Sequence, residues 1–190
     1  MNPVVIDPVC VPLLLVERHE WQRAEASLEL ARATRQPLRL CEALTELARC
    51  ERHSGNAEGA ALRFDEALGW ARQLASVDLL ADLLCERGEL AADDALDALQ
   101  PMRDPDPDAW LLARACAAEA AVLAARTSDP GWEVQVLLRA SDLFNRLGHN
   151  GEAVALQARA LLRMNASPGT QADTPAGPRN VAVARPVKLQ

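Results

Sequence analysis

Apolar residues recur at helical spacing from about residue 10 to residue 164, in segments separated by short turn-forming stretches. The stretch SGNAEGAALRFDEAL, residues 54–68, is typical of them. A Ser-Gly-Asn turn leads into a segment that places Ala60, Phe64 and Ala67 on one stripe of a helix. Because glycine and proline mark the helix ends, about nine helices are predicted, and the expected fold class is all-α.

The predicted helices are short. The first two cover residues 11–18 and 20–34, and the third begins at Pro37, a residue type favoured in the first helical turn. The fourth extends to about residue 74, and the fifth is expected to end at Gly88, because helices commonly end at a glycine. The sixth covers residues 89–99, and three more follow a proline-rich loop.

The pattern of residues 54–68 recurs along the chain. At a shift of 93 residues, Gly55 matches Gly148, Ala60 matches Ala153 and Ala67 matches Ala160. At a shift of 36, Ala60 matches Ala24, Phe64 matches Leu28 and Ala67 matches Ala31. At a shift of 33, Gly55 matches Gly88. Alanine lets two helices approach closely, and glycine permits the tight turn between them. Each unit leaves an apolar face open, so the units are expected to stack.

These units resemble the tetratricopeptide repeat (TPR) family, whose helix pairs are about 34 residues long. The matching residues in the unit that starts at Cys41 are Leu47 and Ala48 at the family's Leu-Gly positions, Gly55 at the turn, and Ala60, Phe64 and Ala67 at the family's Ala, Phe and Ala positions. Trp21 and Phe144 stand at the aromatic position of other units, where this unit has Glu51. The resemblance implies a right-handed α-α superhelix of antiparallel helix pairs, with its concave groove lined by the first helix of each pair.

Two regions are predicted from the change in composition. Residues 1–164 form the TPR-like helical repeat domain. Residues 165–190 are rich in Pro, Gly, Ala and Thr and lack a sustained apolar period. Such a segment buries too little apolar surface to offset the entropy lost on ordering, so a disordered C-terminal tail is predicted.

Composition and charge narrow the classes of partner. Hydrophobic residues make up 49% of the chain, aromatic residues only 3%, and the formal net charge is -7. An acidic chain lacks the basic surface that nucleic acids and anionic membranes require, and no apolar run reaches the roughly 18 residues of a membrane span. The five cysteines include no CxxC pair, which indicates free thiols in a reducing compartment. A cytoplasmic protein with neither nucleic-acid nor membrane partners is therefore expected.

The sequence contains no recognisable catalytic motif, so we expect no enzyme, no cofactor and no metal site. Its three histidines, His19, His53 and His149, fall at or near predicted turns and are interpreted as solvent-exposed. Asp93 and Asp97 lie one helical turn apart and are interpreted as part of a solvated face.

The resemblance also implies where a partner binds, namely on the first helices of the units. The predicted groove residues are Glu42, Thr45, Arg49, Arg52, Asp78, Asp82, Gln135, Asp142, Asn145 and Arg146, with His53 beside them. Guanidinium groups bind carboxylates and backbone carbonyls of an extended peptide. The predicted function is thus a non-catalytic protein–protein interaction module, an adaptor or chaperone, that binds a protein or peptide segment.

Two further possibilities stay open. One is a sensory or regulatory module of a bacterial-type signalling or secretion system, in which the seventh and eighth helices form a ligand or dimerisation pocket. The other is a homodimer, because Leu156, Leu161 and Leu162 of the last helix are available to a second copy of the chain.

Overall fold

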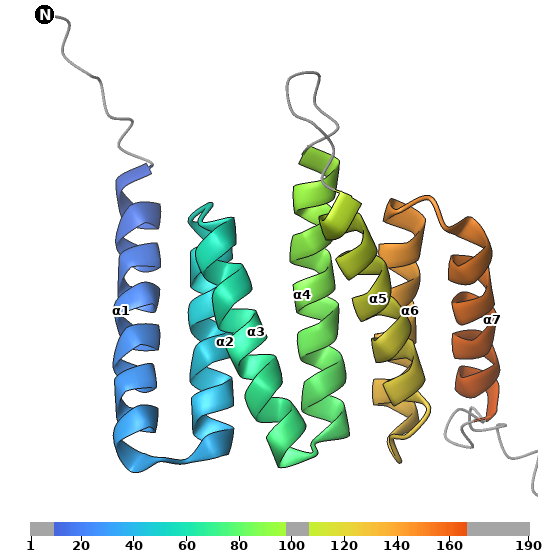
Figure 1. Ribbon diagram of the computed structural model, residues 1–190, viewed down its shortest axis with the longest axis horizontal. Helices are drawn as coiled ribbons and strands as arrows, with labels where there is room; N and C mark the ends of the chain where they lie inside the picture. The colour runs from blue at the N-terminus through green and yellow to red at the C-terminus, as the bar shows by residue number, and fades with distance from the viewer. Residues whose placement is uncertain (1–9, 98–106, 167–190) are drawn as a thin grey trace, which may run out of the picture.

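The computed structural model describes residues 10–97 and 107–166, which form seven α-helices and no strand (Figure 1). The helices are α1 (Cys10–Thr34), α2 (Pro37–His53), α3 (Ala57–Leu74), α4 (Val77–Asp97), α5 (Pro107–Ala124), α6 (Pro130–Arg146) and α7 (Asn150–Ala166). The predicted all-α class is confirmed for these residues. None of the described helices is long and apolar enough to cross a membrane. The predicted tail begins within the last turn of α7, and residues 167–190 lie outside the described residues.

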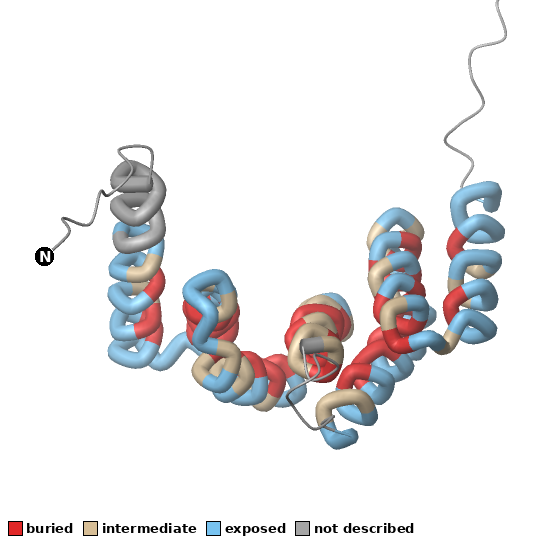
Figure 2. The backbone as a smooth tube through the Cα atoms, turned by 90° about the horizontal axis from the view of Figure 1, so that it is seen from above, coloured by how far each residue is buried: buried red, intermediate tan, exposed pale blue. Residues whose placement is uncertain are grey.

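Successive helices run in opposite directions and stand side by side (Figure 1). Each packs against the next helix in the chain, most extensively within the pairs α2 and α3, α4 and α5, and α6 and α7. Seen from above, the row of helices follows an arc (Figure 2). The helices α2, α4 and α6 lie on the inner side of this arc, and α3 and α5 lie on its outer side.

The prediction of nine helices is wrong, because two predicted breaks do not exist. Helix α1 continues through residues 18–20, and α4 continues through Gly88. A Cβ atom at position 88 would lie 3.1 Å from Cβ of Cys116 and 3.1 Å from Cδ1 of Leu143. Glycine at this position therefore lets α5 and α6 approach α4 and does not end the helix. The match of Gly55 with Gly88 was a false one.

The predicted glycine turns at Gly55 and Gly148 are present. Both residues have positive φ, +81° and +77°, where glycine avoids the steric penalty of a side chain. The amide of Gly55 donates to the carbonyl of Arg52 at 3.1 Å, and the amide of Gly148 donates to Asn145 at 3.0 Å. Helix α6 begins 93 residues after α2, and α7 begins 93 residues after α3. These two pairs therefore share the same arrangement of helix, glycine turn and helix.

The interior is built largely of alanine and leucine, as the matched stripes predict. Ala60, Phe64 and Ala67 of α3 are completely buried, and Ala153 and Ala160 of α7 are at most 1% exposed. The same buried cluster extends through all seven helices. The small side chains allow the close helix contacts, and the leucines and Phe64 fill the space between the pairs.

One carboxylate is buried in this stack with incomplete pairing. Glu51 at the end of α2 is 6% exposed, and its Oε2 atom has no hydrogen-bond partner among the described residues. The nearest charge is Arg63, whose Nε atom is 3.8 Å from Oε1 of Glu51. Burial raises the pKa of Glu51 above its ordinary value of 4.5, and the charge of Arg63 opposes that rise.

The difference in the free energy of unfolding between Glu51→Gln and the wild type is expected to shift in favour of the variant as the pH rises. A carboxyl whose pKa is raised in the folded state contributes stability below its ordinary pKa and loses that contribution as the pH rises through the raised value. Glutamine does not titrate, so the free energy of unfolding of Glu51→Gln minus that of the wild type should increase between pH 4 and pH 7. Urea unfolding at both pH values measures this difference. Glu46→Gln, at an exposed position of α2, is the control, and a profile for Glu51→Gln parallel to that of the control would contradict the assignment.

Candidate interaction surface

The inner side of the arc carries an ion network that connects α2, α4 and α6. Its members are Arg49 and Arg52 of α2, Asp82, Glu86, Glu89 and Asp93 of α4, and Arg139 and Arg146 of α6. The four acids of α4 follow one another at intervals of four, three and four residues, a spacing that places them on one face of the helix. The central helix therefore supplies the acids of the network, and its two neighbours supply the arginines.

The contacts between α2 and α4 are direct. Arg49 makes a bidentate pair with Glu86, in which Nε lies 3.0 and 3.1 Å from the two carboxylate oxygens and Nη2 also donates to Oε1. Arg52 donates to Asp93 at 2.6 Å and to Glu89 at 3.3 Å. The hydrogen bonds to Glu86 are the main reason that the pKa of Arg49 is raised above its ordinary value.

Helix α6 reaches the same acids from the other side. Arg139 donates to Glu89 from Nη2 at 2.8 Å, and its Nη1 atom lies 3.7 Å from Oδ1 of Asp82. Arg146 donates to Asp93 at 2.5 Å, and the indole of Trp132 donates to Asp82 at 3.4 Å. Glu89 and Asp93 are thus each bound by one arginine from α2 and one from α6, so the network is continuous across three helices.

The network is neutral as a whole and only partly shielded from water. The exposed fraction of its side chains ranges from 12% for Glu86 to 52% for Arg49. Burial raises the pKa of Asp82, while the hydrogen bond from Trp132 opposes the rise. Isolated pairs at such exposure contribute at most about 1 kcal/mol to stability. Each arginine is held by at least one carboxylate, and Arg49 has the largest exposed fraction of the eight side chains.

The structure places the predicted groove residues in three settings. Arg49, Arg52, Asp82 and Arg146 belong to the ion network. Glu42, Asp78, Gln135, Asp142 and Asn145 are exposed on α2, α4 and α6. Thr45 does not lie on the surface: it is 7% exposed, and its hydroxyl donates to the carbonyl of Cys41 at 2.8 Å. Its inclusion in the groove is corrected, because this position of α2 faces the interior.

Sequence reasoning missed half of the network, namely Glu86, Glu89, Asp93 and Arg139. Asp93 had been interpreted as part of a solvated face, yet it binds two arginines. The signal was present in the regular spacing of the acids between residues 82 and 93. It was not recognised because the predicted helix end at Gly88 divided this row into two unrelated halves.

The histidines differ in their environments. His53 and His19 are exposed, as predicted. His149 is only partly exposed, because its ring lies 6.4 Å from that of Trp110 and 6.2 Å from that of Phe144, measured between ring centroids. Within the described residues, no group of three or more His, Cys, Asp or Glu side chains is arranged to hold a metal ion.

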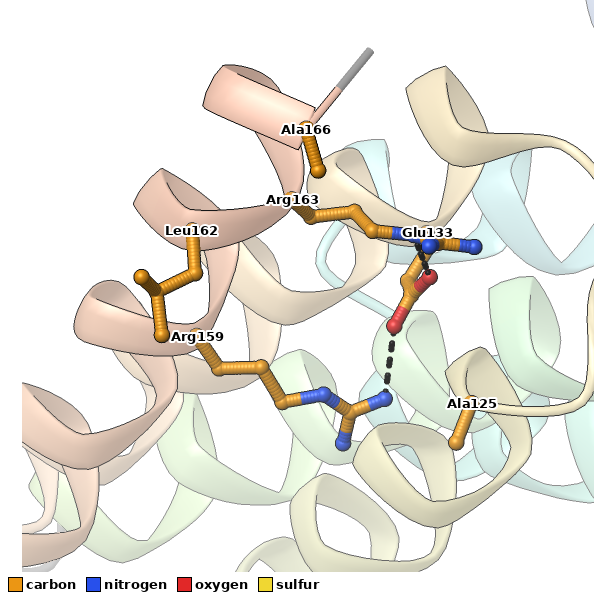
Figure 3. Close-up of a pocket in the computed structure, with 6 residues that line it drawn as sticks. All are labelled: Ala125, Glu133, Arg159, Leu162, Arg163 and Ala166. Atoms are coloured by element: carbon orange, nitrogen blue, oxygen red, sulfur yellow. Dashed lines mark hydrogen bonds and ion pairs between the residues drawn. The ribbon is translucent and has the colours of Figure 1, made fainter.

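A second charged cluster lies where α6 begins and α7 ends (Figure 3). The carboxylate of Glu133 is 7% exposed, and it accepts from Arg159 at 2.7 Å and lies 2.6 Å from Nε of Arg163. Together with Ala125, Leu162 and Ala166, these residues line a cavity of about 400 Å³. The two arginines hold the C-terminal half of α7 to α6.

No protein-family model matches the sequence, and no curated protein shows significant sequence similarity to it. Among solved structures, the chain is similar to the crystal structure of BtubC (BKLC) from P. vanneervenii, with a TM-score of 0.60 and 16% sequence identity. The alignment covers 89% of this chain and 63% of the length of BtubC. The likeness is one of fold.

Proposed function

We propose that the chain is a TPR-like, right-handed α-α superhelix that acts as a non-catalytic interaction module and binds an extended segment of a partner protein along its concave side. The observation that carries this proposal is the surface formed by α2, α4 and α6. Charged and polar side chains from three helices gather on the inner side of the arc, and the ion network fixes their relative positions.

The chemistry of this surface suits a peptide backbone and its polar side chains. Arg49 keeps about half of its side chain exposed while its guanidinium is held by Glu86, so it can donate further hydrogen bonds without first being ordered. Gln135 and Asn145 add amide groups that both donate and accept. A fixed row of donors and acceptors reduces the entropy lost on binding an extended chain.

The alternative of a ligand-sensing module has one observation in its favour, the cavity beside Glu133. However, its charged lining residues are already paired with one another across α6 and α7. A ligand that binds there has to compete with these ion pairs, whereas the exposed residues of the concave side need no such displacement. We therefore favour protein binding.

Changing the exposed residues of the concave side tests the proposal without disrupting the ion network. The double variant Gln135→Lys and Asp142→Lys raises the net charge by three at two exposed positions of α6, because it adds two positive charges and removes one negative charge. We expect proteins that co-purify with the wild type from native lysate to be lost, because the added charges alter the surface that the partner contacts. Quantitative mass spectrometry of the co-purified proteins measures the loss.

The matched control makes the same change of charge on the outer side of the arc. Glu58→Lys with Gln73→Lys also raises the net charge by three, at two exposed positions of α3. Equal recovery of partners by the concave variant and the wild type would refute the proposed surface, and so would equal losses in the two variants.

A further inference from the structure

The arginines of the ion network on the concave side are already paired with acids of the same chain. Arg49, Arg52, Arg139 and Arg146 bind the acids of α4, and the network carries no net charge. A carboxylate of a partner has to compete with these acids for the guanidinium groups, which makes an acidic partner a poor match. The charge that a partner meets is therefore set by the exposed residues around the network.

The exposed charged residues around the network are mostly carboxylates. Each carboxylate stands three, four or seven residues from a network member on the same helix, a spacing that places it on the same face. These residues, called here the inner carboxylates, are Glu42 and Glu46 of α2, Asp78 of α4 and Asp142 of α6, all of them exposed. Arg39 of α2 is an exposed arginine at the edge of this face. The concave side therefore presents an excess of negative charge.

Electrostatic effects within the chain agree with this placement. The hydrogen bonds to Glu86 raise the pKa of Arg49 most, and the charge of Glu46 adds to the rise. Burial raises the pKa of Asp82, and the charge of Asp78 adds to that rise. Among the described residues, the inner carboxylates form no ion pair. They are therefore available to basic groups of a partner.

The outer side of the arc differs in this respect. Three exposed carboxylates of α3 and α5 each have an arginine nitrogen within 3.9 Å, namely Asp65, Glu66 and Glu119. Their charges are balanced locally, although Glu58 of α3 is exposed and forms no ion pair among the described residues. Unbalanced negative charge is thus greater on the concave side than on the outer side (Figure 2).

We propose that the segment bound along the concave side is basic, an extended stretch of a partner protein that carries several lysines or arginines. This inference rests on the proposed function and names the chemistry of the partner. The basic side chains pair with the inner carboxylates, and the backbone carbonyls of the segment accept hydrogen bonds from Arg49. In an extended chain every second side chain projects to the same side, so one edge of the segment can carry the positive charges that complement this surface.

Synthetic peptides separate charge from the other features of a partner. The probe is a fluorescently labelled peptide of alternating lysine and threonine, and two matched probes carry glutamate or glutamine in place of every lysine. Fluorescence anisotropy with the full chain should show binding of the lysine peptide alone. This binding should be lost in 1 M salt, where the Debye length falls to about 3 Å. Equally tight binding of the glutamate or glutamine peptide would overturn the proposal, and so would no binding of the lysine peptide.

Removing two of the inner carboxylates tests where the lysine peptide binds. Glu42→Gln with Glu46→Gln is expected to raise its dissociation constant about two- to tenfold, because two exposed charge pairs are lost. Glu58→Gln with Glu66→Gln changes the net charge equally, at exposed positions of α3 on the outer side, and should leave the constant unchanged. Equal weakening in both variants would mean that the peptide responds to the charge of the whole chain, which contradicts the proposal.

Failure of the basic assignment and failure of the proposed function give different results. The lysine peptide reports only on the charge of the partner, whereas the proteins recovered with Gln135→Lys and Asp142→Lys report on the surface itself. If that variant loses its partners while the lysine peptide does not bind to the wild type, the concave side binds a segment of other chemistry. The proposed function then stands, and the basic partner is refuted.

Discussion

Replacing Phe64 with alanine is expected to lower the free energy of unfolding by about 3–5 kcal/mol, the range observed when a buried aromatic ring is removed. Phe64 is completely buried and is the largest of the fully buried side chains. Its ring lies in the α3 stripe between Ala60 and Ala67, where the small neighbours bring helices close on both sides. Because those helices are fixed by many other contacts, they cannot move inward to fill the space that the ring leaves.

Equilibrium unfolding in urea measures this loss. Leu62→Ala is the matched control in the same helix, because Leu62 is 64% exposed and its removal leaves no cavity. A shift of the unfolding midpoint as small as that of the control would mean that Phe64 does not fill the space between the helix pairs. The assignment of α3 as the packing helix of its repeat would then be wrong.

The second large effect concerns Gly88, where leucine is expected to lower the free energy of unfolding by about 1–3 kcal/mol or more through overpacking. The added side chain begins at a Cβ position only 3.1 Å from atoms of both Cys116 and Leu143. Those atoms belong to α5 and α6, so the leucine has to push two helices away from α4. The pair α4 and α5 has the most extensive contact of the stack, and the damage should extend through both halves of the molecule.

Gly69 provides the matched control for this substitution. It also lies inside a helix, α3, but a Cβ atom there would meet no other atom within 4 Å. Gly69→Leu should therefore leave stability unchanged or raise it by up to about 1 kcal/mol, since leucine has the higher helix propensity. Thermal unfolding of the two variants separates packing from propensity. Similar melting temperatures would show that the close approach at Gly88 does not exist in solution.

The sequence allowed the helical class, the turns at Gly55 and Gly148 and the buried stripe of α3 to be predicted, because these depend on residues close together in the chain. The structural role of Gly88 could not be predicted in the same way. A glycine ends a helix in one context and permits close packing in another, and the difference lies in Cys116 and Leu143, which are distant in sequence.

The ion network illustrates the same limit. Arg49 and Glu86 are 37 residues apart, and Arg146 and Asp93 are 53 apart. Their pairing depends on α2, α4 and α6 lying beside one another while α3 and α5 occupy the outer side of the arc. The family resemblance placed Arg49 and Arg146 on one surface, but it could not show that the acids of α4 already bind them. Four of the residues predicted to contact a partner also make contacts within the chain, namely Arg49, Arg52, Asp82 and Arg146.

The neighbour-to-neighbour packing of the helices has a mechanical consequence. Most contacts join a helix to the one before or after it, but α4 and α6 also contact each other, so each of them contacts three helices. Tension applied to the two ends of the described stack therefore meets one helix interface at a time, with α1 and α7 peeling away first. The force needed should rise when the separation reaches α4 or α6, where several interfaces and the ion network must break together.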